Sequence, residues 1–549
     1  MLEDINPQNI QDVEGGRKIA VRLLNVVEGL QQEGEKLKAE NQRLRDENNR
    51  LKGEQGKPEV KGNKKATNIS SEQERKSTKP RKPKPNRTKR KKQSELKIDQ
   101  EMTMRIEKEV LPKDAEFKGY ETVVVQDIEI KREVTRFRRE KYYSPSEQKS
   151  YVAALPKGYV GQFGPKLKAL VLTQYYSSGM SEPKIIEFVE QMGISVSPGT
   201  ISNWISKPSE EWLAEADEIL RAGLASTPWQ HIDDTGTRVD GVNHHCHIVC
   251  NPFYTAYATR RYKNRLTVIA VLQNNEQPVY LYNERTQEWL KQLGVPKWAW
   301  QLIAKWPQNE LLNEEQARQL LLGQLSERLN SQQQARVLEA GALTAYYAQD
   351  RYPVIPILVS DDAPQFSNLA QSQMLCWVHE GRHYKKLTPH ITYHRTIWQQ
   401  FQTDFWAYYH KLQAYRVNPD PLQAAQLRAD FDTLFGQTTD YDALNKRLAA
   451  TLARKAKLLV VLDYPAVPLH NNPAELGARQ RVRKRDVSFG PRTQHGRVAW
   501  DTFMTVAETA KKLGVGFYHY VLDRLSQTNS LPKLSDIIRS HSPPAPAGF

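Results

Sequence analysis

The stretch WQHIDDTGTRV, residues 229–239, places Asp233 and Asp234 within a segment that otherwise has the composition of a buried strand. Two more strand-like stretches follow it, NHHCHIVCN at 243–251 and YTAYATRRYKNRLTVIAVL at 254–272. Their apolar and β-branched residues predict three consecutive strands. A carboxylate on a buried strand costs free energy unless it is paired or binds a cation. The acidic pair is therefore either a turn at a strand end or part of a functional site.

Two other segments place carboxylates in comparable positions. Asp361 and Asp362 end the buried strand predicted for PVIPILVSDDA, and Glu475 lies in VPLHNNPAELGARQRVRKR, residues 467–485. These positions are far apart along the chain, so only a folded domain brings them together with Asp233. Three carboxylates would suit two divalent cations about 4 Å apart, which activate an attacking oxygen and stabilise the leaving oxygen of a phosphodiester. Mg²⁺ prefers such hard oxygen ligands.

Local rules allow a simpler role for each carboxylate. Asp233 and Asp361 can be turn residues at strand ends. Glu475 fits a capping box, with Asn472 as the N-cap and Pro473 at the first helical position, in which the glutamate reaches back to a backbone N–H. The spacing alone favours capping over catalysis for Glu475.

The cations that follow Glu475 favour catalysis. Arg479 and Arg483 lie four and eight residues after it, on the same face of the predicted helix. A phosphate backbone held beside a metal site would explain this basic face, and a solvated charged surface is the alternative. Three further cations add to the charge of the helix: Arg481, Lys484 and Arg485.

Residues 18–53 carry the clearest periodicity of the chain. Leucine recurs in strict steps of seven, as the d positions of a heptad, and asparagine stands at two matching a positions, where it fixes register and a two-stranded state. We predict a parallel dimerising zipper; a single amphipathic helix packed on its own domain is the alternative. The residues of this interface are Leu23, Leu30, Leu37, Leu44 and Leu51, with Asn41 and Asn48.

The chain carries 79 lysines and arginines against 63 acidic residues, a formal charge of +16. A basic balance favours polyanionic partners, because cations that neutralise phosphates release condensed counterions. The charge is densest at 79–92, KPRKPKPNRTKRKK, within a linker without apolar period. This linker is either only a solvated connection or also an arm that contacts DNA through Lys89, Arg90 and Lys91.

Three helical stretches begin near Phe163: GPKLKALVLTQYYSSG, SEPKIIEFVEQMG and SPGTISNWISK. Ser197 and Pro198 give the third stretch an N-cap and a first helical position. The turn MGISVS before it matches a helix-turn-helix unit, and an ordinary helical hairpin is the alternative. In a helix-turn-helix, four side chains of the third stretch face a DNA groove: Thr200, Ser202, Asn203 and Lys207.

The 3 cysteines are too few for a disulfide framework in 549 residues, which favours a reducing compartment. The N-terminus MLEDINPQNI lacks a signal pattern, and no apolar run approaches the ~18 residues of a membrane span. We therefore expect a cytoplasmic protein without a membrane partner. The cluster HHCHIVC suggests zinc, but His245 and His247 share a strand face with few further ligands, so we expect no zinc.

Four segments together resemble the DDE transposases of the insertion-sequence-sixty-six (IS66) family: HIDDTGTRV, LVSDDAPQF, CWVHEGRHYKKL and HNNPAELGARQRVRKRDVSFG. The resemblance implies an RNase H-like core that uses two Mg²⁺ or Mn²⁺ ions to cut and join DNA at the ends of a mobile element. It implies a bacterial protein, associated with the nucleoid when bound to DNA, and accessory transposition proteins as in many members. Carried over by motif, the catalytic and metal-binding residues are Asp233, Asp361 and Glu475, with Asp234 and Asp362 as second choices.

The segment CWVHEGRHY places His379 and Arg382 shortly after the second aspartate. By resemblance these side chains contact DNA or the transition state, and a buried Cys–Trp face with a surface arginine is the alternative. Members of the family usually have glutamate at the position of Asp234. They commonly carry a cysteine-rich zinc segment before the helix-turn-helix, whereas residues 96–160 contain no cysteine and read as a small antiparallel β-unit.

The predicted fold is α/β and multidomain, with an RNase H-like mixed-sheet core interrupted by helical insertions. We expect a DNA transposase that binds terminal inverted repeats and catalyses Mg²⁺-dependent strand cleavage and 3′-OH strand transfer. The alternatives are a catalytically silent or domesticated DNA-binding regulator and an RNase H-fold nuclease without strand transfer. The predicted parts are 1–53 (leucine-zipper coiled coil), 54–95 (basic linker), 96–160 (small β-rich unit without zinc ligands), 161–215 (helix-turn-helix domain), 216–283, 350–390 and 465–525 (core), 284–349 and 391–464 (helical insertions) and 526–549 (C-terminal tail).

Overall fold

The computed structural model describes residues 13–51, 97–107, 109, 111–112 and 114–542. The basic stretch that contains Lys89, Arg90 and Lys91 lies outside the described residues, as does the very end of the chain. Within the described part, none of the helices combines the length and the apolar character that crossing a membrane requires.

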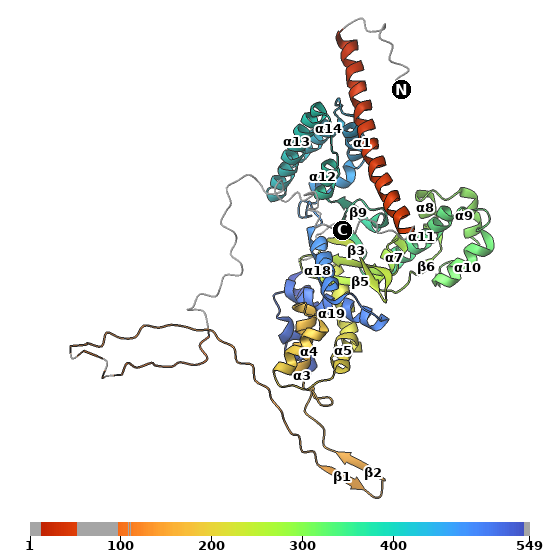
Figure 1. Cartoon of the computed structure of the whole chain (residues 1–549). Helices are drawn as coiled ribbons and strands as arrows, with labels where there is room; N and C mark the ends of the chain where they lie inside the picture. The colour runs from red at the N-terminus through yellow and green to blue at the C-terminus, as the bar shows by residue number, and fades with distance from the viewer. Residues whose placement is uncertain (1–12, 52–96, 108, 110, 113, 543–549) are drawn as a thin grey trace.

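A mixed sheet of five strands lies at the centre of the molecule, in the order β5-β4-β3-β8-β9 (Figure 1). β3, β4 and β5 pair antiparallel, whereas β8 lies parallel to both β3 and β9. The sheet and its many helices confirm the α/β class. The strands are β3 (Trp229–Val239), β4 (Val242–Cys250), β5 (Thr255–Arg260), β8 (Ile355–Ser360) and β9 (Ala370–Leu375).

The third predicted strand is shorter than expected. Only Thr255–Arg260 is a strand, and the second half of the same stretch forms helix α7, Arg265–Leu272. Asn264 caps this helix, because its side chain accepts a hydrogen bond of 3.0 Å from the Thr267 N–H. The run is buried on all sides, and a continuous apolar run does not by itself distinguish a buried strand from a buried helix.

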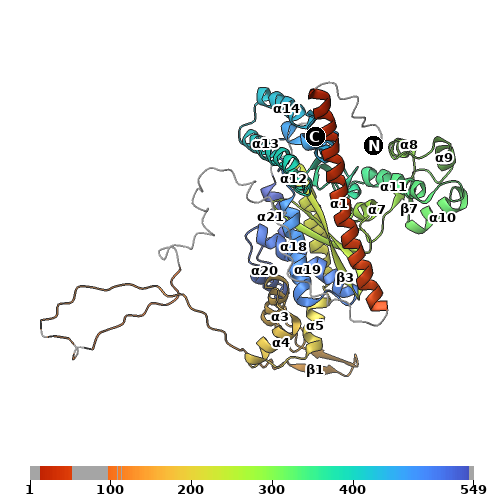
Figure 2. The same ribbon diagram turned by 45° about the horizontal axis from the view of Figure 1, so that its top comes forward.

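Two groups of helices interrupt the sheet, and they lie on different sides of it (Figures 1 and 2). The second group begins at Trp377, before the predicted boundary at residue 391. The first group comprises α8 (Glu284–Gln292), α9 (Lys297–Ile303), α10 (Glu314–Gln324) and α11 (Ser331–Ala348), with a small ladder of β6 (Tyr280–Leu281) and β7 (Leu311–Leu312). The second group comprises α12 (Trp377–Lys385), α13 (Thr392–Val417), α14 (Pro421–Gly436), α15 (Asp442–Leu452), α16 (Lys455–Leu458) and α17 (Val460–Asp463).

The second helical group has an aromatic core of its own. Trp377 opens α12 and is fully buried, with its ring centroid 5.8 Å from that of Phe405 and 6.2 Å from that of Phe431. Its indole N–H donates to the Leu458 carbonyl oxygen at 2.9 Å. This packing fixes α12, the helix that carries His379 and Arg382.

Two long helices near the C-terminus pack on the sheet: α18, Asn472–Ser488, contacts β3 and β4, and α19, Gln494–Lys512, contacts β5. Gly477 allows the close approach of α18, since a Cβ there would lie 2.9 Å from Cγ2 of Ile248. Ile248 is the register partner of Asp233, so α18 covers the face of the sheet on which Asp233 lies.

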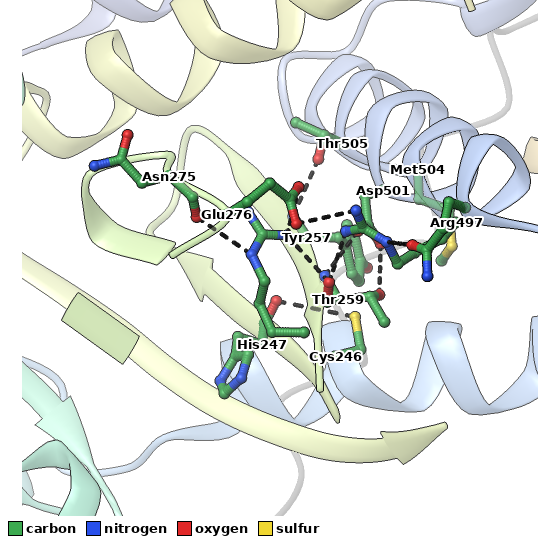
Figure 3. A network of polar contacts seen from close by, with 12 residues as sticks. Cys246, His247, Tyr257, Thr259, Asn275, Glu276, Arg497, Asp501, Met504 and Thr505 are labelled. Carbon is green, nitrogen blue, oxygen red and sulfur yellow. Dashed lines mark hydrogen bonds and ion pairs between the residues drawn. The ribbon is translucent and has the colours of Figure 1, made fainter. Parts of the chain in front are cut away.

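A buried polar network ties α18 and α19 to β5 (Figure 3). Asp501 accepts hydrogen bonds of 2.7 Å from both the backbone N–H and the hydroxyl of Thr259. Arg481, only 1% exposed, donates to the same hydroxyl at 2.9 Å and lies 3.4 Å from Asp501. Arg497 donates to the Thr259 carbonyl oxygen at 2.8 Å.

Two cations predicted to add to the basic face of α18 are therefore buried. Arg481 belongs to the network above, and Lys484 donates to the Tyr175 carbonyl oxygen at 2.7 Å, with its ammonium 3.1 Å from the centroid of the Tyr175 ring. Burial, helped by the charge of Arg481, lowers the pKa of Lys484 to about 7. Helix periodicity places both side chains on the face of α18 that meets the sheet and η4, Thr173–Ser177. Their charge in the sequence gives no sign of this burial.

The helices predicted before the core are present as α3 (Pro165–Leu172), η4 (Thr173–Ser177, a π-helical turn), α4 (Glu182–Gln191) and α5 (Pro198–Ser206). Ser197 caps α5 as predicted, accepting from the Thr200 N–H at 3.2 Å. Ile201 and Ile205 are buried, Asn203 and Lys207 are exposed, and Thr200 and Ser202 are partly exposed.

The predicted β-unit at 96–160 is largely wrong. It contains a single hairpin of β1 (Lys141–Ser144) and β2 (Lys149–Val152), while the described residues before Lys141 form no strand. Apolar side chains that alternate with polar ones there, such as Val123 and Ile128, are 73% and 80% exposed. Alternation produces a strand only where a partner strand and a core are present.

The C-terminal region contains more structure than a tail. Helices α20 (Phe517–Leu525) and α21 (Leu534–His541) follow α19. α21 packs on α6 (Glu210–Ala225), and its Leu534 and Ile538 are fully buried.

The predicted zipper segment is one helix, α1, Val13–Leu51, which lies beside α12 and α13 (Figures 1 and 2). Glu28, 3% exposed, accepts hydrogen bonds from the backbone N–H groups of His390 at 2.8 Å and Ile391 at 3.0 Å. The Asn25 amide donates to the Asp440 carbonyl oxygen at 2.9 Å. The alternative of a helix packed on its own domain is thus right for one face.

Four of the heptad leucines remain exposed in spite of this docking. Leu23, Leu30, Leu37 and Leu44 are 40%, 60%, 59% and 55% exposed. Glu28 and Asn25 occupy b and f positions of the same heptad, which lie on the outer side of a coiled coil. Docking on the domain therefore leaves the a and d face open.

We predict that Arg481→Ala destabilises the core by about 3 kcal/mol, because it removes one of the two arginines beside buried Asp501 and the partner of the Thr259 hydroxyl. Arg479→Ala, an exposed position on the same helix, should change the free energy of unfolding by no more than about 0.5 kcal/mol. Urea unfolding followed by tryptophan fluorescence measures both. Equal midpoints for the two variants would contradict the structural role of Arg481.

Candidate active site at the ends of β3 and β8

The parallel pairing of β3 with β8 brings the two predicted aspartates together. Trp229 pairs with Ile357 and His231 with Val359. The same register continued by two residues sets Asp361, the first residue after β8, alongside Asp233 on β3. Asp233 accepts a hydrogen bond of 2.8 Å from the Asp234 N–H, and Asp361 one of 3.1 Å from the Ala363 N–H.

Glu475 reaches the same place from the first turn of α18. The residue before this helix, Asn471, is 3% exposed and holds it against β3. Its side-chain amide donates to the Ile232 carbonyl oxygen at 2.7 Å, and its Oδ1 lies 3.1 Å from Nδ1 of His231. The Asn471 N–H meets the Cys376 thiol at 3.2 Å. One asparagine therefore aligns β3, α18 and the start of α12.

The charges of the three carboxylates act on one another. Burial, together with the negative charges of Asp361, Glu475 and Asp234, raises the pKa of Asp233 to about 7 and outweighs the Asp234 N–H, which lowers it. Burial also raises the pKa of Asp361, with the Ala363 N–H and His379 opposing the shift. Carboxyl groups with raised pKa values are typical of sites that receive a positive charge.

The predicted capping role of Glu475 is wrong. The N-cap position is Asn471 rather than Asn472, and no side chain caps the helix. Both oxygens of Glu475 instead accept hydrogen bonds from Arg382, at 3.2 and 3.0 Å. This bidentate ion pair is the strongest geometry available to a carboxylate and a guanidinium. Nη1 of Arg382 also lies 3.5 Å from Nδ1 of His379.

The second-choice aspartates have other partners. Asp234 accepts a hydrogen bond of 3.0 Å from the side-chain amide of Gln365. Asp362 lies 2.8 Å from Arg454 and 3.2 Å from His383. Although burial acts in the opposite direction, these two neighbours lower the pKa of Asp362. Asp234 and Asp362 thus each have a side-chain partner of their own, which Asp233 and Asp361 do not share.

The donors suit a hard divalent cation, because Asp233 and Asp361 offer neighbouring carboxylate oxygens. As placed, no group of three or more His, Cys, Asp or Glu side chains among the described residues could hold a metal ion. Glu475 is engaged by Arg382, so it must leave that arginine before it can act as a third ligand. Two histidines of the HHCHIVC cluster have backbone partners: His244 contacts the Val242 carbonyl oxygen and His247 that of Tyr262.

The profile of the Transposase IS66 family matches residues 160–281 and 294–499, a span that contains all three carboxylates. The chain belongs to the IS66 family of transposases. It is also similar to the uncharacterized protein y4jO of Sinorhizobium fredii, with 32% identity over 310 residues, which are 56% of this chain and 94% of that protein. Membership of a transposase family places the chain, broadly, among the enzymes of nucleotidyl transfer.

Three predicted DNA-binding cations lie on α18 downstream of Glu475. Arg479 and Arg483 are exposed, on the helix face that the sheet does not cover. Arg485 is partly buried and donates to the Gly236 carbonyl oxygen at 2.5 Å. The exposed pair is compatible with the predicted basic face, whereas Arg485 turns toward β3.

Sequence reasoning missed two features of this IS66 site. The ion pair of Arg382 with Glu475 joins residues far apart in sequence, and nothing local indicates it. Asn471 and His231 both stand in the quoted motifs, but their contact requires the sheet. Burial lowers the pKa of His231 to about 3, which keeps the ring neutral beside Asn471.

We predict that Asp233→Asn stabilises the metal-free protein above neutral pH. The pKa of Asp233 is raised to about 7, so its ionisation costs folding free energy that grows as pH rises from about 4 to about 7. At pH 8 the variant should gain on the order of 2 kcal/mol. Thermal unfolding in a chelator from pH 5 to 8 measures this.

Asp362→Asn is the matched control. The pKa of Asp362 is lowered by His383 and Arg454, so its charge stabilises the fold above its ordinary pKa. This variant should lose stability at pH 8. Wild-type protein should also gain thermal stability on addition of Mg²⁺, and Asp233→Asn should gain less. Parallel pH profiles for wild type and Asp233→Asn would refute the electrostatic account.

Proposed function

We propose that this protein is a DNA transposase that binds the terminal inverted repeats of an insertion sequence and catalyses Mg²⁺-dependent strand cleavage and 3′-OH strand transfer. The observation that carries the proposal is that Asp233, Asp361 and Glu475 gather next to the end of β8, on the sheet face that α18 covers. Like charges gathered in a half-buried place need a compensating cation, and a phosphodiester is the substrate that such carboxylate sites process.

The topology supports an RNase H-like core. Three antiparallel strands are followed, after a helical insertion, by two parallel strands that extend the sheet from β3. The first aspartate lies on the central strand, the second follows its parallel neighbour, and the glutamate comes from a helix across the same face. The long insertions leave this order intact because they enter between strands.

The residues present fit two Mg²⁺ or Mn²⁺ ions, with Asp233 and Asp361 as the first ligands and Glu475 as the third. Such ions, when bound, activate the attacking oxygen and stabilise the leaving oxygen of a phosphodiester. Arg382, once released by Glu475, is close enough to neutralise a phosphate or the charge of the transition state. His379 lies beside it and would orient the same phosphate.

DNA contacts come from three regions in this proposal. Helices α4 and α5 act as a helix-turn-helix, with Asn203 and Lys207 exposed at its surface. Arg479 and Arg483 follow the phosphate backbone away from the carboxylates. The basic stretch with Lys89, Arg90 and Lys91 is a further proposed contact. Double-stranded element ends and target DNA are the substrates, and accessory transposition proteins are expected partners.

One observation favours the alternative of a catalytically silent DNA-binding protein. The Arg382 ion pair occupies Glu475, whose side chain is 23% exposed. In the transposase proposal this pair describes the metal-free resting state, whereas in the alternative it is permanent. A nuclease without strand transfer would share the metal site and differ only in the fate of the 3′-OH.

We predict that the protein cleaves duplex DNA that carries the inverted repeats flanking its reading frame, in Mg²⁺, and joins the freed 3′-OH to a target plasmid. Asp361→Asn and Glu475→Gln should lower the cleavage rate by about 10³-fold or more, because each removes a metal ligand. Asp234→Asn and Asp362→Asn are the matched carboxylate controls and should cleave within about tenfold of wild type.

The products distinguish the three functions. Cleavage without joining identifies a nuclease, and binding without cleavage identifies a silent regulator. Equal cleavage by wild type and Glu475→Gln, or none by either, would rule out the assignment of Glu475.

We further propose that α1 pairs with α1 of a second copy through its exposed heptad leucines, in parallel and in register, as Asn41 and Asn48 at a positions favour. The docked face, with Asn25 and Glu28, lies on the outer side of such a coiled coil. The dimer would therefore hold two catalytic domains at a set separation, as pairing of two element ends requires.

Leu30→Asn combined with Leu37→Asn should convert the dimer to a monomer, because both apolar d positions lose their packing. Lys36→Asn combined with Arg43→Asn, at the exposed c positions of the same helix, is the control and should remain dimeric. Light scattering after size-exclusion chromatography gives both masses. A dimer that survives the leucine substitutions would show that pairing uses another surface.

A further inference from the structure

A hollow of about 440 Å³ lies between the β3–β4 hairpin and the second half of α18. Gly236, Thr237, Arg238, His244, His245 and Arg485 contribute to its wall. No carboxylate is among the residues that line it, and two arginines are. The hollow is separate from the carboxylate cluster, and the proposed catalysis does not use it.

Its position relative to the carboxylates is set by two regular elements. Thr237 pairs with His244 in the β3–β4 ladder and is four residues from Asp233, so both lie on the face that α18 covers. Four residues of strand span about 13 Å. Arg485 is ten residues after Glu475 on α18, which is about 15 Å along the helix. Both estimates place the hollow at a similar distance from the candidate active site.

The polar groups of the hollow are arranged for an anion. Thr237 is only 5% exposed, yet its hydroxyl has no hydrogen-bond partner among the described residues. A buried polar group without a partner costs free energy, which a ligand that hydrogen-bonds to it would recover.

The arginines supply the charge that such a ligand would meet. Arg238 is exposed at the rim. Arg485 is held by the Gly236 carbonyl oxygen at 2.5 Å, with the exposed Asp486 3.6 Å from its Nη2. One hydrogen bond leaves further N–H donors on its fork, which matches the oxygens of a phosphate.

We infer that this hollow binds one backbone phosphate of the DNA strand about four nucleotides from the phosphodiester that reacts, at the ~3.4 Å per nucleotide of a duplex strand. The inference rests on the proposed function. A base is a poorer occupant, because no Phe, Tyr or Trp is among the described residues that line the hollow, and bases bind to such rings by stacking. The contact fixes the register of the strand over the carboxylates and carries no sequence information.

The test is a scan in which single phosphates of the element-end duplex are replaced one at a time by uncharged methylphosphonates. Wild-type protein should lose about tenfold in affinity at one position roughly four nucleotides from the cleavage site. In Arg238→Gln combined with Arg485→Gln, neutralising that phosphate should have no further effect, because the contact is already lost. Thr237→Val, which keeps the side-chain shape, should show a smaller loss at the same position.

Arg285→Gln, an exposed arginine on α8, is the control for loss of a single charge, and it should keep the wild-type response to the scan. The salt dependence gives a second readout. The slope of log affinity against log salt should fall by about 0.9 in the double variant, as expected for one lost phosphate contact. Circular dichroism and the thermal midpoint establish that each variant is folded.

Three results would overturn the inference. In the first, wild type cleaves element ends normally, and the variants respond to every neutralised phosphate as wild type does. Inorganic phosphate could occupy the hollow while no DNA phosphate depends on it, which would assign the site to a free anion. If wild type neither binds nor cleaves element ends, the proposed function fails and this inference fails with it.

Discussion

The parallel pairing of β3 with β8 is the constraint on which the site depends. It sets Asp233 beside Asp361 on adjacent strands, where burial and mutual repulsion raise the pKa of Asp233 to about 7. The fold tolerates this cost because a neighbouring guanidinium, that of Arg382, draws the third carboxylate, Glu475, into an ion pair. The same unfavourable gathering of charge would favour the binding of the proposed cation.

The rest of the core holds α18 over the part of β3 that carries Asp233. Asn471 locks the start of the helix to β3, Gly477 lets it approach β4 closely, and Arg481 joins it to Asp501 through Thr259. Three kinds of contact along one helix thus fix the position of Glu475 to within what side-chain rotation allows. Positioning of this kind is required of a site that distinguishes a transition state from its substrate.

α1 links the proposed dimer to the candidate site, because it docks on the segment that follows α12. Glu28 accepts hydrogen bonds from the backbone of His390 and Ile391, at the connection between α12 and α13. α12 carries Arg382, the partner of Glu475. Burial by itself would raise the pKa of Glu28. The two backbone N–H groups and His394 outweigh burial, so the pKa is lowered overall and the side chain keeps its charge at neutral pH. Pairing of two copies through α1 would therefore involve a helix that docks next to α12, which lines the proposed active site.

The sequence by itself determined the elements and the residues of chemical interest. Heptad spacing predicted α1, Ser197 and Pro198 predicted the start of α5, and acidic residues after apolar runs marked Asp233 and Asp361, because these signals are local. Only the tertiary structure decided which contacts those residues make. It assigned Glu475 to Arg382 instead of a cap, buried Arg481 and Lys484, and left the alternating residues before β1 without a sheet. Burial and pairing depend on neighbours distant in the chain, and local patterns do not encode them.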